Sequence, residues 1–359
     1  MIQTQSTTQI YCVNPLPEER NDDFYYTPDS RVSQLVLDAL GAGKYIDELP
    51  SRKCQINHNT AYTLVAKDGK HIITSNNCNG EISLTLSDLT HLTGTNKAAK
   101  KLFVLALIKV NEQAVRDTKL VCHYVSFPLQ ELVDIGFYTS IRSARNGFNR
   151  EKDSLTQLEV QGSFRGVRRK KYSVDTMTAL FSNAFIKNGQ CYIYMNTTID
   201  WGFLIQYFTV LPRYYFHLSN RASDLLYYIF YLARQNTQEL ESHGYFMISF
   251  RALQHKLMIP SEEGQDHIQR DIKEAIEGTV SQLLEAHRKY CGDEKFSLTR
   301  VCGSCRTTKE YLDNSHLKVE IGGKFASKFI AFNRRTINKI EEKRGRQAKN
   351  KEKTPAVAN

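Results

Sequence analysis

A single stretch, His123 to Lys171, constrains the fold of this chain more than any other part of the sequence. Alternating apolar residues predict a strand over 121–127, and apolar residues at helical spacing then predict a short helix that Gly136 ends. A second helix is expected over 141–154, and a basic hairpin follows it. This order of a strand, two helices and a hairpin is typical of a winged helix-turn-helix.

The second of these helices has an apolar face and a basic face. Ile141, Ala144 and Phe148 recur at three- and four-residue spacing and are expected to face inward, with Thr139 or Ser140 as the N-cap. Arg can bind guanine and Asn can bind adenine through paired hydrogen bonds, so the outer side chains suit a DNA major groove, the alternative being a solvated helix face. The predicted DNA-contacting residues of this helix are Arg142, Arg145, Asn146, Asn149, Arg150 and Lys152.

The hairpin after this helix predicts a wing. Residues 157–164 alternate as a strand, and 191–195 are expected to supply the returning strand. The glycine turn is strongly basic, which suits contact with DNA phosphates, although a basic run by itself is often only a solvated loop. The predicted phosphate-contacting residues are Arg165, Arg168, Arg169, Lys170 and Lys171.

The pattern recurs in the second half of the chain. A helix is expected over 220–235, followed by a strand, a short helix over 251–257 and a long helix over 265–289. The phrases VSFPLQELVDIG and ISFRALQHKLMI share a strand, Ser-Phe and an apolar-spaced helix, which supports two similar folds. The exposed residues predicted to contact DNA here are fewer and less basic: Gln265, Gln269, Arg270 and Lys273.

Weaker patterns flank and join these units. Prolines and polar residues predict irregular structure over the first thirty residues. Apolar and aromatic residues at helical spacing predict a helix before Pro212. Together the patterns predict an α+β chain of two winged-helix domains in tandem with a poorly structured N-terminal segment. The predicted divisions are an extension over 1–80, the first domain over 81–198, the second over 199–335 and a basic tail over 336–359.

The charge balance favours a polyanionic partner. The formal net charge is +10 and the pI is about 9.1, so nucleic acid is favoured first and an anionic membrane surface second. No membrane span or signal peptide is visible, and the cysteines are scattered singly apart from Cys302 and Cys305, so a reducing cytoplasm is expected. These two cysteines form half of a zinc-ligand set without a second pair, and we expect no metal and no cofactor.

The layout resembles the replication initiator (Rep) proteins of theta-replicating plasmids and related mobile elements. The resemblance is carried by VSFPLQELVDIGFYTSIRSARNGFNRE, and by NRASDLLYYIFYLARQN with the two helices after it, and spans residues ~82 to ~335. It implies a sequence-specific DNA-binding protein that binds repeated double-stranded sites at an origin and promotes its opening. It also implies a homodimer, and a host helicase or other replication proteins as partners. The long segment 1–80 and the insertion 296–316 depart from the family pattern.

Two other hypotheses stay open. A winged-helix transcriptional regulator would share every feature described above. A DNA-nicking or processing enzyme belongs to a different class, and such enzymes usually carry two His flanking one apolar residue together with a Tyr nucleophile. None of the ten His is placed that way, and no phosphate-binding loop or acidic metal cluster is apparent. We therefore expect a protein without enzymatic activity.

Overall fold

The computed structural model describes residues 24–29, 33, 36–37, 51–57, 60–67, 70–77, 80–86, 97–116, 123–165, 171–199, 201, 207–257, 266–292, 295–303 and 305–323. These residues form helices and sheets in which each strand pair is antiparallel, so the chain is α+β as predicted. No helix among them is long and apolar enough to cross a membrane.

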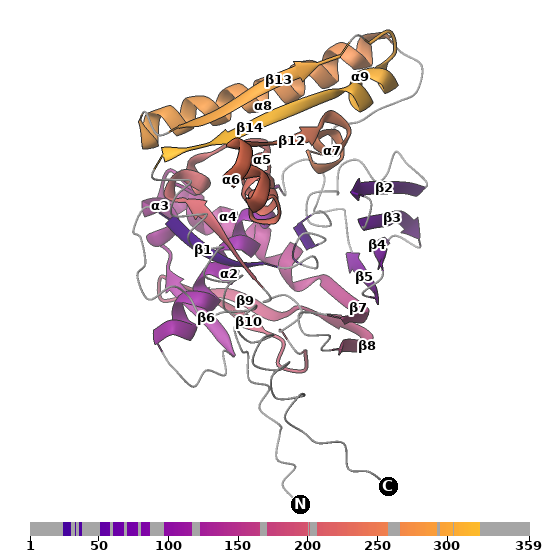
Figure 1. Ribbon diagram of the computed structural model, residues 1–359. Coiled ribbons are helices and arrows are strands. Elements are labelled where there is room, and N and C mark those ends of the chain that lie inside the picture. The colour runs from indigo at the N-terminus through magenta and orange to yellow at the C-terminus, as the bar shows by residue number, and fades with distance from the viewer. Residues whose placement is uncertain are drawn as a thin grey trace, which may run out of the picture.

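The elements follow one another along the chain as shown in Figure 1. In order they are β1 (Phe24–Asp29), β2 (Ser51–Asn57), β3 (Thr60–Lys67), β4 (Lys70–Asn77), β5 (Gly80–Leu86), α2 (Lys97–Arg116), β6 (Tyr124–Pro128), α3 (Glu131–Asp134), α4 (Ile141–Thr156), β7 (Leu158–Arg165), β8 (Lys171–Ala179), β9 (Phe181–Lys187), β10 (Gln190–Met195), β11 (Tyr207–Pro212), the 3-10 helix η3 (Arg213–His217), α5 (Asn220–Gln235), α6 (Thr237–His243), β12 (Tyr245–Ser249), α7 (Phe250–Lys256), α8 (Asp266–Cys291), β13 (Phe296–Cys302), α9 (Thr308–Asn314) and β14 (Ser315–Ile321).

Two units repeat one order of elements. In the first, the long helix α2 precedes β6, α3 and α4; in the second, α5 precedes β12, α7 and α8. Each unit also has a three-stranded sheet with the same connectivity, β6-β10-β9 in the first and β12-β14-β13 in the second. The repeated strand, short helix and long helix predicted from the two phrases are therefore confirmed.

The units differ in what is inserted into them. In the first unit β7 and β8 lie between α4 and β9, and they join β2 to β5 in a sheet of order β2-β3-β4-β5-β7-β8. In the second unit the helix α9 lies between β13 and β14. The six-stranded sheet thus combines residues 51–86 with residues 158–179, and it crosses the boundary predicted near residue 80.

The predicted returning strand of the basic hairpin is wrong. The sequence predicts that 191–195 returns to 157–164, but β7 pairs with β8, and β10 pairs with β6 and β9. Asn188 (φ 50°) and Gly189 (φ 74°), which lie between β9 and β10, explain why β10 pairs with β9 and not with β7. Two central residues with positive φ close a tight turn whose twist matches paired strands, so β9 and β10 form a hairpin of their own.

The helix predicted before Pro212 is also wrong over 207–211, which belongs to β11. This strand pairs with β1, so that Tyr25 lies opposite Leu211. The same pairing corrects the irregular structure predicted for the first thirty residues, since Phe24–Asp29 is a strand. Pro28 lacks a backbone N–H, but a two-stranded sheet has only edge strands, where proline is tolerated.

The helix α2 lies at the centre of the first unit. Each residue from Leu102 to Ile108 is at most 1% exposed, and a helix that is apolar on every side is expected to be surrounded by other elements. It contacts β1, β6, α4 and α5. Because α2 contacts both α4 and α5, it links the position of α4 to the second unit.

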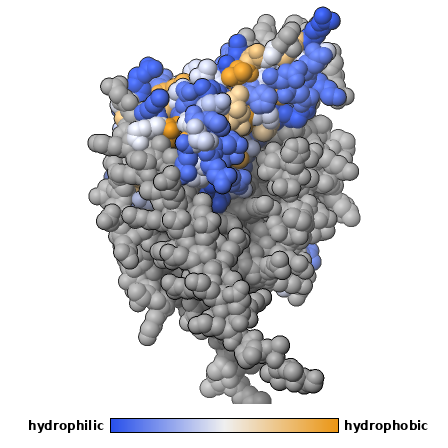
Figure 2. Space-filling view, in the orientation of Figure 1, coloured by the Kyte–Doolittle hydropathy of each residue, from blue (hydrophilic) through white to orange (hydrophobic). Residues whose placement is uncertain are grey.

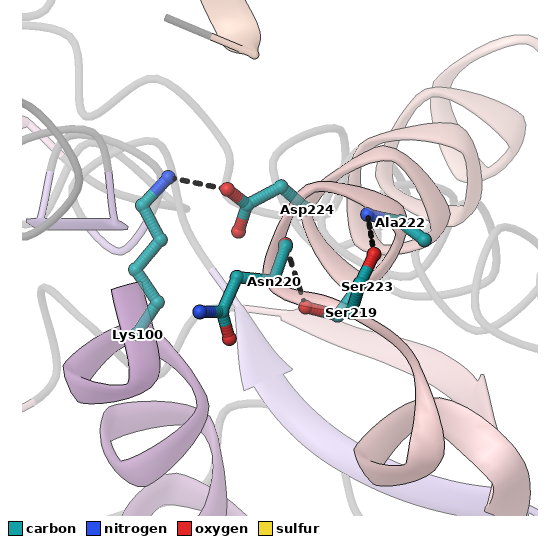
Figure 3. Close-up of polar contacts among 6 residues, drawn as sticks. All are labelled: Lys100, Ser219, Asn220, Ala222, Ser223 and Asp224. Carbon is teal, nitrogen blue, oxygen red and sulfur yellow. Dashed lines mark hydrogen bonds and ion pairs between the residues drawn. The ribbon is translucent and has the colours of Figure 1, made fainter. Parts of the chain in front are cut away.

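Two lysines near the start of α2 add polar contacts to this link. Lys100 Nζ lies 2.8 Å from Asp224 Oδ2 on α5, and its side chain is 2% exposed (Figure 3). Lys101 Nζ donates to the carbonyl oxygens of Phe216 (3.2 Å) and Leu218 (2.5 Å) in the connector between the units. Burial lowers the pKa of Lys101 to about 8, with Asp224 opposing the shift.

Candidate functional site

The start of α4 is fixed by a reciprocal cap. Ser140 Oγ accepts a hydrogen bond from the Ser143 backbone N–H (3.2 Å), and Ser143 Oγ accepts one from the Ser140 N–H (3.0 Å). This capping box satisfies two backbone donors that the first turn of a helix leaves without an intrahelical partner. Ser140 as the predicted N-cap is confirmed, and the first turn of α4 is held in place.

The inner face of α4 packs on α2 and β9. Ala144 and Phe148 are fully buried as predicted, and the Phe148 ring meets Phe127 of β6 edge-on, with centroids 6.4 Å apart. The prediction that Ile141 faces inward is wrong, since it is 39% exposed. A helical side chain covers the turn before its own Cα, so Ile141, as the first helical residue, covers the cap and not the core.

The outer face of α4 brings the predicted basic and amide side chains together. Residues three and four apart share one side of a helix, and the side chains at 142, 145, 146 and 149 are all exposed. Arg150 is 50% exposed on one flank, and Lys152 is 28% exposed and lies 3.6 Å from Asp153. The helix therefore presents cationic and amide side chains along its length. Its one exposed carboxylate, Asp153, lies near its end.

A buried carboxylate holds Arg150. Glu151 is fully buried, and its Oε1 accepts from Arg150 Nε at 2.7 Å. Burial raises the pKa of Glu151, while Arg150 and the backbone of Ala99 oppose the shift. Within the described part of the chain, Oε2 has no partner at ordinary hydrogen-bond geometry. Among the described residues, this guanidinium contacts Glu151 through Nε, so its two terminal nitrogens can form a paired contact.

The side chain of Tyr138 lies across α4 at Gly147. A Cβ at Gly147 would lie 2.2 Å from the Tyr138 ring. The Tyr138 ring stacks on Phe137 with centroids 4.6 Å apart. Burial and then the nearby Glu151 carboxylate raise the pKa of Tyr138. Gly147 thus lets the chain before α4 pack closely against the side of the helix.

The remaining predicted contact residues are only partly covered by the structure. Arg165 and Lys171 face each other at the ends of β7 and β8, and their side chains lie outside the described residues. The backbone of α8 includes 269, 270 and 273, whose side chains are likewise not described. Four of the predicted residues lie outside the described residues altogether: Arg168, Arg169, Lys170 and Gln265. The roles predicted for all of them stay predictions.

A partly exposed aromatic cluster was missed by reasoning from the sequence. On the outer face of the sheet β6-β10-β9, Tyr124 lies 5.2 Å from Tyr194 and 6.0 Å from Tyr192 between ring centroids. The Phe185 ring lies 5.3 Å from the Tyr192 ring and 5.7 Å from the Tyr194 ring. The alternation in CYIYM was a visible signal, but recognising the cluster also needs 181–187 to be identified as a strand.

The second unit presents a different surface. Figure 2 shows that its visible face is mostly hydrophilic, with separate hydrophobic residues rather than one apolar patch. Met247, Val301 and Tyr290 are the large hydrophobic residues exposed in this unit among those described. Across the described part of the chain, no three His, Cys, Asp or Glu residues are grouped as metal ligands would be.

Comparison with known proteins finds structural likeness at low sequence identity. No protein-family model and no curated protein matches the sequence. The Pi initiator protein in complex with iteron DNA is 15% identical with a TM-score of 0.40, over 64% of this chain and 92% of that one. Domains 2 and 3 of RctB are 9% identical with a TM-score of 0.40, over 80% of this chain and 99% of that one. The first of these structures is an initiator protein, the class of protein that the sequence pattern resembles.

Proposed function

We propose that this chain is a non-enzymatic, sequence-specific DNA-binding protein that initiates replication by binding repeated double-stranded sites at an origin. One observation carries the proposal: the exposed face of α4 presents Arg142, Arg145, Asn146 and Asn149 side by side. Arg and Asn are the side chains that pair in two-point fashion with guanine and adenine in the major groove. A helix of this kind in a strand-helix-helix unit is suited to that groove.

The surroundings of α4 support base reading over general attraction to polyanions. The capping box and the buried face hold the helix rigidly, so little ordering is needed when DNA binds. Glu151 restrains Arg150 through one nitrogen, which orients its guanidinium before contact. The cap and the buried face also occur in ordinary surface helices, so the restraint on Arg150 is the feature that favours base reading. The net charge of +10 adds attraction that does not depend on sequence.

The two units suggest how several sites are used. We propose that both are winged-helix domains, with the first reading bases through α4 and the second binding a neighbouring site or a second protomer. Binding energy from repeated sites would then bend or open an adjacent segment. Occurrence on a plasmid or mobile element, a homodimer and recruitment of a host helicase are carried over from the family resemblance of the sequence.

The test is binding to DNA that flanks the gene. Footprinting should locate the sites, and the triple variant Arg142→Ala/Arg145→Ala/Arg150→Ala should then weaken specific binding by about 1–3 kcal/mol per residue. The matched control is Arg288→Ala/Lys289→Ala, which removes two exposed cations from the end of α8. Specific binding that survives the triple variant, or that falls equally in the control, would contradict the assignment.

The same experiment separates the rival functions. Several direct repeats, together with replication that depends on the protein, indicate an initiator, whereas one palindrome beside the gene indicates a transcriptional regulator. Incubation of supercoiled DNA with magnesium or manganese tests the third possibility. Nicked product that forms with the wild-type chain and is lost in a Tyr→Phe variant would replace the non-enzymatic proposal with a DNA-processing enzyme.

A further inference from the structure

We propose that the outer face of the sheet β6-β10-β9 binds single-stranded nucleic acid by stacking bases on its aromatic rings. This platform consists of the nine outward positions of the three strands. Their register places them in three rows: Pro128, Gln190 and Lys187; Ser126, Tyr192 and Phe185; and Tyr124, Tyr194 and Asn183. Aromatic residues occupy four of these positions.

The rings form a continuous layer across the sheet. Tyr124 on the first strand and Phe185 on the last each contact both Tyr192 and Tyr194 on the middle strand. The interplanar angles of three of these pairs lie between 23° and 28°. Tyr124, at the end of the layer, remains 40% exposed. A nucleobase is flat and aromatic, so it can extend such a layer.

The other platform positions favour a nucleic acid over a protein partner. None of the nine carries a carboxylate, and Lys187 supplies a cation at the hairpin end. None is an aliphatic Val, Ile, Leu or Met, although cores and permanent protein interfaces are rich in these. Instead Ser, Asn and Gln surround the rings and can hydrogen-bond base edges, and the Tyr hydroxyl groups give this face a polar character.

The second unit provides an internal comparison. Its sheet has the same connectivity. Aligning VSF with ISF and following the register puts Met247, Lys318, His316 and Val301 at the positions of Tyr124, Tyr194, Tyr192 and Phe185. Lys318 pairs with Glu320 at 2.6 Å and lies over the Tyr245 ring at 4.4 Å. That face is therefore mixed, with a charged pair beside the exposed aliphatic side chains of Met247 and Val301, and it has no layer of Tyr and Phe rings. An aromatic layer is not required for this fold, so its presence in the first unit calls for a ligand.

The platform lies on the side of the sheet opposite α4. The inward residues Val125, Phe127 and Ile193 are buried, and Phe127 contacts α4 through Phe148. A duplex on α4 and a single strand on the platform would not compete for the same residues. The proposal therefore does not depend on duplex recognition by α4, and each can fail without the other.

Fluorescence anisotropy of the full chain tests the platform. The probe is a labelled oligothymidylate of about 20 nucleotides, longer than a single platform is expected to cover. Tyr192→Ala and Tyr194→Ala should each weaken its binding on the order of ten-fold, because one stacked base loses its ring. Tyr192→Phe should keep wild-type affinity, while Tyr192→Leu, which retains apolar packing without a flat ring, should not.

Controls locate the effect on the platform. Met247→Ala and Thr299→Ala on the equivalent face of the second unit should leave oligothymidylate binding unchanged, and binding of the footprinted duplex should be the same in all platform variants. The proposal is overturned if wild-type protein fails to bind oligothymidylate, or if Tyr192→Leu binds it as the wild type does. It is also overturned if the Tyr variants change only the oligomeric state, because a second copy would then be the occupant.

Discussion

At the scale of single residues, the decisive arrangement is a carboxylate buried beneath an exposed arginine of α4. Glu151 is fully buried, while its partner Arg150 is 50% exposed. A carboxylate in such a place is costly, because burial raises its pKa even though Arg150 and the backbone of Ala99 oppose the shift. This unfavourable burial occurs in the helix that carries the candidate base-reading side chains. We infer that the Glu151 carboxylate orients Arg150.

Glu151→Gln separates this cost from the contribution to binding. Burial raises the pKa of the folded Glu151 carboxyl above its usual 4.5. The folded protein thus binds the proton more tightly than the unfolded chain, and this stability is present below pH 4.5 and is lost as the pH rises through the folded pKa. Urea unfolding should show Glu151→Gln gaining stability relative to wild type at neutral pH but not at pH 4.

The same variant should weaken specific DNA binding, because the Arg150 guanidinium loses its charged anchor. Glu285→Gln on the exposed side of α8 is the matched control and should alter neither property. If Glu151→Gln is less stable than wild type at every pH, the carboxylate stabilises the fold. A role in orienting Arg150 is then not needed to explain why a carboxylate is buried there.

At the scale of elements, close packing at Gly147 positions α4. An added methyl group would overlap the Tyr138 ring, which stacking on Phe137 holds in place. Gly147→Ala should therefore destabilise the protein by about 1–3 kcal/mol in urea unfolding, even though Ala favours helices. Gly278→Ala is the control, because nothing lies near its Cβ in α8, and it should stabilise by up to about 1 kcal/mol.

Adding Tyr138→Ala tests the mechanism. With the ring removed, Gly147→Ala should cost far less than it does in the wild type, which a double-mutant cycle measures as a coupling free energy. Additive effects of the two substitutions would mean that the cost arises elsewhere than in the contact with Tyr138.

Elements whose signals are local were predictable from the sequence, and those that depend on distant partners were not. The expected helix over 141–154 is found as Ile141–Thr156, because spacing and the Ser140 cap lie within the segment itself. The strand β11 exists through pairing with β1, which is far away in the chain, and its apolar spacing also suits a helix. The aromatic platform was missed for the same reason, because only strand register brings Tyr124 beside Tyr194.

At the scale of the whole molecule, contacts between α2, the connector and α5 join the two units. The Phe216 ring of η3 packs on Phe137 at 5.7 Å between centroids, and the Tyr214 hydroxyl lies 3.0 Å from His287 Nδ1 on α8. The connector is thus held by both units and is not a loose tether. If both units bind DNA as proposed, their fixed relation would set the spacing of the sites that they bind together.

The ion pair between Lys100 and Asp224 provides the sharpest test of this relation. Both side chains are largely buried, so Lys100→Met alone leaves a carboxylate with no partner charge and should cost on the order of 3 kcal/mol in urea unfolding. Lys100→Met/Asp224→Leu removes both charges and should recover most of that loss, since apolar replacement of a buried pair is often neutral. If the pair sets the relation between the units, the recovered double variant should still bind paired sites with altered dependence on their spacing. Unchanged spacing preference at full stability would assign the orientation to the apolar contacts of α2 instead.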